Sequence, residues 1–103
     1  MSSPRPARPK TPAGIAFGIR ELVLLRAWAE WRGLHMEIAL DHASPDGEYE
    51  ELVCLYTPGA LVPKLTLWRR LDAAVVQGMR ERPQRFRSVS AALEALSLPV
   101  GRA

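Results

Sequence analysis

The chain has 103 residues, of which 48% are hydrophobic and 24% charged, and its formal net charge is +3. This composition is ordinary for a folded protein and excludes wholesale disorder, and the length allows one small domain with a single core. The only cysteine, Cys54, excludes an internal disulfide and a cysteine-rich metal site. Because a lone thiol suits a reducing compartment and even the most apolar window, residues 15–31, carries four charges, we predict a cytoplasmic protein without a membrane segment.

Charge is distributed unevenly along the chain. Residues 1–13 carry the whole net charge, because the other 90 residues contain 11 basic and 11 acidic side chains. Residues 33–63 contain six acidic residues and no Lys or Arg, whereas residues 64–87 contain seven basic residues and two acidic ones. An acidic segment followed by a basic one indicates a partner selected by charge.

The first predicted elements are a tail and a helix. Residues 1–13 combine four prolines with three basic residues, so we expect a disordered tail, followed by a single domain over 14–98 and a C-terminal tail over 99–103. From Ile15 to Arg32 the apolar residues follow helical spacing, and the glycine that comes next is a typical C-cap. The helix has two apolar stripes, formed by Phe17, Leu24, Trp28 and Trp31 and by Leu22, Leu25 and Ala29.

Residues 34–56 are predicted to form a β-hairpin. Apolar and polar residues alternate in its first half, and residues 44–47, Ser-Pro-Asp-Gly, have the residue types of a tight turn. That turn sets a register that opposes Leu40 to Leu52, Ile38 to Cys54 and Met36 to Tyr56. The register therefore predicts that Ile38 and Cys54 lie in the core and that Glu50 lies at an exposed rim.

The segment over 64–80 has two interpretations. Its apolar residues alternate as in strands, but they also follow helical spacing. We favour strands, because two adjacent valines and a glycine disfavour a helix and a hairpin alone is a poor platform; the alternative is a helix over 66–82 that leaves the hairpin packed on helices. Ser88 is a typical N-cap for a closing helix that stops at Pro99. The sequence predicts an α+β fold with an N-terminal helix, an antiparallel β-meander of three to five strands and a C-terminal helix.

Residues with catalytic or ligand-binding chemistry are sparse. His35 and His42 occupy odd and even positions of one strand, so they point to opposite faces and cannot easily share a metal. Cys54 is expected to be a buried, inert thiol, and no phosphate-binding glycine fingerprint occurs. We therefore predict that the protein is not an enzyme and uses no cofactor or metal.

An arginine-rich segment suggests nucleic acid as one partner. Residues 79–87 read MRERPQRFR and surround one aromatic side chain with arginines; the candidate contacts are Arg80, Arg82, Arg85, Phe86 and Arg87. Basic side chains beside an aromatic ring are typical of single-strand binding, and the basic tail would add phosphate contacts. Nucleic-acid binding through the tail and segment 80–87 is therefore the alternative function.

The order of elements also resembles an RNA-binding family, but the nucleic-acid alternative rests on the charge distribution alone. Over residues 15–97, the order of a helix, three strands and a helix is similar to that of the double-stranded-RNA-binding domain. This resemblance implies RNA as a ligand. Where that family presents a lysine cluster at the start of its last helix, this chain has Ser-Val-Ser-Ala at residues 88–91.

The acidic hairpin predicts a protein-interaction surface. If the apolar set of the predicted register faces the helices, the other face shows acidic residues around an apolar centre; these are Glu37, Ala39, Asp41, Glu51, Val53 and Leu55. A charged rim around an apolar centre is typical of a transient interface, and the acids select a basic partner. We therefore expect a non-catalytic interaction or self-associating module. Because one small sheet covers only one stripe of the first helix well, we expect either a homodimer or an unidentified protein partner.

Overall fold

The structure is a computed structural model that describes residues 16–42 and 49–98, so the predicted tails and the predicted turn at 44–47 lie outside the described residues. The elements in chain order are α1 (Ile19–Trp31), β1 (His35–His42), β2 (Tyr49–Tyr56), β3 (Leu65–Arg70), β4 (Ala73–Gly78), β5 (Gln84–Phe86) and α2 (Val89–Ser97). The predicted α+β fold is confirmed, with five strands between the two helices. The alternative helix over 66–82 is wrong, because this segment forms most of β3 and β4.

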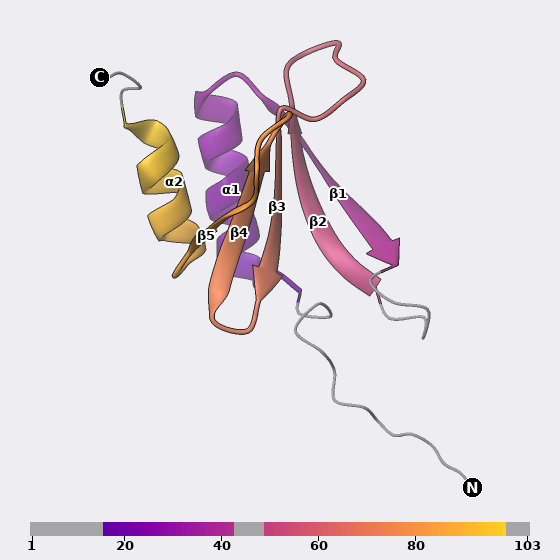
Figure 1. Cartoon of the computed structure of the whole chain (residues 1–103). Helices are drawn as coiled ribbons and strands as arrows, with labels where there is room; N and C mark the ends of the chain where they lie inside the picture. The colour runs from indigo at the N-terminus through magenta and orange to yellow at the C-terminus, as the bar shows by residue number, and fades with distance from the viewer. Residues whose placement is uncertain (1–15, 43–48, 99–103) are drawn as a thin grey trace, which may run out of the picture.

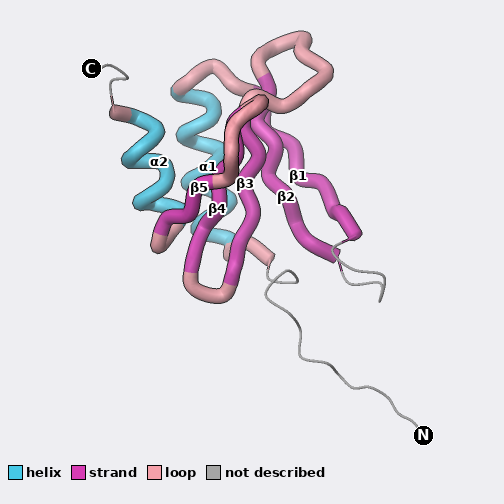
Figure 2. Tube along the Cα trace, in the orientation of Figure 1, coloured by secondary structure: helices cyan, strands magenta, loops and turns pink. Residues whose placement is uncertain are grey.

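The five strands form one antiparallel sheet in the order β1-β2-β3-β4-β5, and the two helices lie side by side on one of its faces (Figure 1). The helix α2 contacts β4 and β5, whereas α1 lies between α2 and β1. A helix is about 10 Å wide and strands are about 4.8 Å apart, so two helices cover about four strands. The sheet is therefore wider than its helical layer. Figure 2 shows β1 as the edge strand far from α2.

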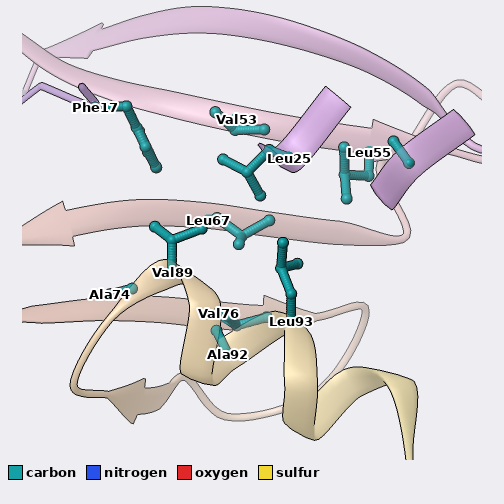
Figure 3. Close-up of a cluster of buried hydrophobic side chains, with 11 residues drawn as sticks. Phe17, Leu25, Val53, Leu55, Leu67, Ala74, Val76, Val89, Ala92 and Leu93 are labelled. Atoms are coloured by element: carbon teal, nitrogen blue, oxygen red, sulfur yellow. The ribbon is translucent and has the colours of Figure 1, made fainter. Parts of the chain in front are cut away.

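The core lies between the helices and the inner face of the sheet, by which we mean the face toward the helices (Figure 3). Leu25 and Ala29 of α1 are fully buried there. The other buried members are Phe17, Val53, Leu55, Leu67, Ala74, Val76, Val89, Ala92 and Leu93. Phe17 precedes α1, and the others come from α2 and from the three central strands, β2, β3 and β4.

The predicted register of the hairpin is wrong by one residue. Ile38 pairs with Val53 and not with Cys54, and the same offset continues through the whole of β1. The reason is that β2 has apolar residues on both faces, so alternation does not decide which face is inner. The decision comes from β3, because Val53 pairs with Leu67 and thereby joins the row of side chains that meets Leu25.

Local signals end α1 and start α2 as predicted, but α1 begins only at Ile19, so the predicted start at Ile15 and the placing of Phe17 on a helical stripe are wrong. Gly33 has a φ of 74°, and the next amide, Leu34 N, donates to Ala29 O at 2.8 Å, so α1 ends in a left-handed cap. Ser88 Oγ accepts from Ala91 N at 3.0 Å and starts α2.

Candidate interaction site

The six residues predicted to form one interaction surface lie on two different faces. Glu37 is exposed on the outer face of the sheet, away from the helices, whereas Val53 and Leu55 are fully buried beneath them. Glu51 also belongs to the inner face, where its Oε1 accepts a hydrogen bond from Phe17 N at 2.8 Å. Ala39 is exposed beside Glu37, and Asp41 pairs with Glu50 in the backbone register. The predicted surface is therefore divided, and two of the three residues of its apolar centre, Val53 and Leu55, belong to the core.

On the outer face of the central strands, charged and aromatic side chains contact one another. Arg70 forms an ion pair with Glu50, and the Glu50 side chain is largely buried. The guanidinium of Arg70 lies 5.8 Å from the centre of the Trp68 ring. Trp68 Nε1 is buried and has no hydrogen-bond partner among the described residues. Glu50 was expected at an exposed rim, but its pairing with Arg70 makes it part of a structural network.

Cys54 lies on this outer face, directly opposite Glu37 and Thr66 in the neighbouring strands. It is buried, as predicted, although its neighbours differ from those expected. Burial raises the pKa of the Cys54 thiol, and the Glu37 carboxylate adds to the rise. The thiol is therefore neutral at ordinary pH and a poor nucleophile.

An apolar groove lies between α1 and β1 on the inner side of the sheet. It encloses about 430 Å³ and is lined by Leu22, Val23, Arg26, Ala27, Glu30, Met36 and Ile38. Val23 is 64% exposed, Ile38 is 48% exposed, and the neighbouring Leu40 is 67% exposed. We call this feature the α1–β1 groove. Sequence reasoning missed it because the strand order, which leaves β1 at the edge of the sheet, could not be read from the sequence.

The strand β1 borders the groove and forms one end of the sheet. It has eight residues, contains no Lys, Arg, Pro or Gly, and pairs with β2 without interruption from His35 to His42. Protein sheets usually protect an edge with prolines, lysines, bulges or short strands. The other end of the sheet, β5, has this protection, because it has three residues and follows Pro83.

The arginine-rich segment forms the approach to β5 and its exit. Arg80, Arg82, Arg85 and Arg87 are all exposed. Phe86 is half-buried, pairs with Ala74 and packs against the core. The aromatic ring is therefore engaged in packing, and the exposed arginines lie around it without a stacking platform of their own.

None of the described helices combines the length and the apolar run that crossing a membrane requires. Among residues 16–42 and 49–98, no three His, Cys, Asp or Glu side chains are grouped so as to hold a metal ion.

Comparison with protein families, with curated proteins and with solved structures finds no match to this chain.

Proposed function

We propose that this protein is a non-catalytic protein-interaction module that binds an extended segment along β1. The observation that carries the proposal is the exposure of Ile38 and Leu40 on an unprotected edge strand beside the α1–β1 groove. An added strand would satisfy the outward backbone groups of β1, and its alternate side chains would enter the groove. Main-chain pairing supplies affinity in this mode, and the groove supplies selectivity for apolar residues.

Charge sets the character of the partner. The only charged residues that line the groove are Arg26 and Glu30, which pair with each other at 3.1 Å and leave an otherwise apolar surface. The outer face of β1 carries Glu37. A bound segment would therefore have apolar residues toward the groove and neutral or basic residues on the other side.

A displayed library of random twelve-residue peptides, selected on the immobilised full chain, tests this proposal. We expect enriched peptides with apolar residues at alternate positions and micromolar affinity. The variant Ile38→Lys places a charge in the groove, so it should weaken binding by at least about tenfold. Met79→Lys is the matched control, because Met79 is 52% exposed and lies in the turn after β4. Peptides that bind Ile38→Lys as well as the unmodified chain would contradict the proposal.

Nucleic-acid binding is the second candidate function. It is favoured by the exposure of all four arginines of segment 80–87. Among the residues that the structure describes, Arg85 is the one of these four held by an ion pair, at 3.4 Å from Asp72, and that pair is itself exposed. Exposed arginines bind phosphates without regard to sequence, so this function is tested through its salt dependence.

A further inference from the structure

One strand whose residues would match β1 is β1 of a second copy. In an antiparallel pair of identical strands related by a two-fold axis, one residue opposes itself at the axis. With Ile38 at the axis, Met36 opposes Leu40 and Glu37 opposes Ala39 of the other copy. Each apolar inner position then meets an apolar one, Glu37 meets a neutral residue, and in the backbone register Asp41 is opposite His35.

Other registers of the same pairing are less favourable. In the register with Glu37 at the axis, Glu37 is opposite Glu37 of the other copy. In the register with Ala39 at the axis, Glu37 is opposite Asp41. Like charges directly opposite each other destabilise a pair of strands. Leu40 at the axis avoids this conflict, but it pairs only residues 38–42. The register centred on Ile38 pairs residues 35–41 and is the longest that opposes no two acidic residues.

The same register also closes the α1–β1 groove. The two-fold axis is perpendicular to the sheet, so both α1 helices lie on one side of the joined sheet. Val23 and Ala27 of α1 are exposed and line the groove toward β1, and Ile19, which lies one helical turn before Val23, is also exposed. Across the axis this flank of α1 faces its copy above the two Ile38 side chains. Apolar surface that a single copy leaves in water is thereby covered.

We propose that two copies of this chain associate through β1, about a two-fold axis at Ile38, so that their two five-stranded sheets become one continuous sheet. This inference rests on the proposed function, because it names the second copy as the bound strand. It differs from the dimer expected from the sequence, which placed the contact on one of two helical stripes. In the structure one of those stripes is core at Leu25 and Ala29, and the apolar flank beside β1 belongs to neither.

Sedimentation equilibrium of the full chain from about 5 to 200 µM tests the assembly, a range that brackets the dissociation constant of a modest interface. We expect a reversible equilibrium of monomer and dimer. Ile38→Lys and, separately, Val23→Lys should shift the dissociation constant upward by at least about tenfold, whereas Met79→Lys should leave it unchanged. Two variants are used because Val23 lies on α1 and its substitution leaves the strand intact.

Disulfide cross-linking between introduced cysteines tests the register of the two β1 strands directly. The background is Cys54→Ala, because Cys54 lies opposite Glu37 in the same hairpin and would trap a cysteine placed there. Single cysteines are introduced at residues 37, 38, 39 and 40 and oxidised at equal concentration. A residue at the axis is within disulfide reach of its copy, whereas a neighbouring residue is more than about 7 Å from its own copy, so we expect Ile38→Cys to cross-link at least about tenfold faster than the rest.

The results separate this inference from the proposed function. A dimer with cross-linking greatest at residue 38 supports the inference. A monomer throughout the concentration range overturns it, and peptide binding that depends on Ile38 would then still uphold the proposed function. A dimer that Ile38→Lys does not weaken, or one that cross-links most at another position, also overturns the inference, because its interface or its register is different.

Discussion

Ile38 and Val53 are opposite each other in the hairpin, but they have different environments. Val53 is fully buried beneath α1, whereas nearly half of the Ile38 side chain is exposed. The difference arises because β2 is central and β1 is at the edge, beyond the cover of α1. A residue's type and its position in a strand therefore do not determine its burial.

Val53→Ala should be the more damaging of two matched substitutions. It leaves a cavity in the core and should lower the free energy of unfolding by about 2 kcal/mol, whereas Ile38→Ala should cost about 1 kcal/mol or less. Urea unfolding at about 2 µM protein measures both and limits any contribution from a dimer. A larger loss for Ile38→Ala than for Val53→Ala would contradict the observed register, because the predicted register buries Ile38 and exposes Val53.

Cys54 provides a second test at the scale of one residue. Because burial raises the pKa of its thiol, the folded protein contains less thiolate at a given pH than the unfolded chain. At pH 8 we expect alkylation in the folded state at least about tenfold slower than in urea. As the pH rises above about 9, the unfolded rate should level off while the folded rate still increases. Equal rates at pH 8 would indicate an exposed thiol.

The helices of this fold depend on single residues at their ends. The helix α2 has only nine residues, so it is too short to be stable alone and relies on its cap and on burial of Val89 and Leu93. Ser88 supplies that cap through its hydrogen bond to Ala91 N. In α1, Gly33 stops the helix so that the chain can turn directly into β1.

Ser88→Ala should lower the free energy of unfolding by about 1 kcal/mol, because Ala91 N loses its partner. Ser90→Ala is the control, since Ser90 is exposed within the same helix and its substitution should change stability by less than about 0.5 kcal/mol. Thermal unfolding of the two variants and the unmodified protein makes the comparison. A larger loss at Ser90 would contradict the observed start of α2.

At the scale of the molecule, the two faces of the sheet have different roles. The inner face packs on the helices but leaves Ile38 and Leu40 of β1 exposed, and the outer face of the central strands contains the ion pair of Arg70 and Glu50. The exposed arginines gather at the β5 end, while the exposed apolar residues of β1 gather at the opposite end. The two candidate functions therefore use opposite edges and can be tested independently.

If the arginine-rich segment binds nucleic acid, the affinity for single-stranded RNA or DNA should fall by about tenfold to a hundredfold between 50 and 200 mM salt, as expected for about four phosphate contacts. Fluorescence anisotropy measures this fall. The combined substitution of Arg80, Arg82 and Arg87 by Gln should weaken binding, whereas the same change at Arg20 and Arg26 of α1 and at Arg32, its C-cap, removes equal charge and should have less effect. Absence of binding at tens of micromolar protein would exclude this function for the nucleic acids tested.

The sequence by itself predicted the order of the elements, the end of α1 at Gly33 and the cap of α2 at Ser88. These features depend on local chemistry, namely periodicity, the backbone freedom of glycine and the hydroxyl of serine, so they can be read from neighbouring residues. It also predicted that Cys54 is buried. Only the tertiary structure decided the register of the hairpin, because both faces of β2 are apolar and its pairing with β3 selects the inner one. The α1–β1 groove also follows only from the tertiary structure. It exists because two helices side by side are narrower than a five-stranded sheet, and no stretch of the sequence records that difference in width.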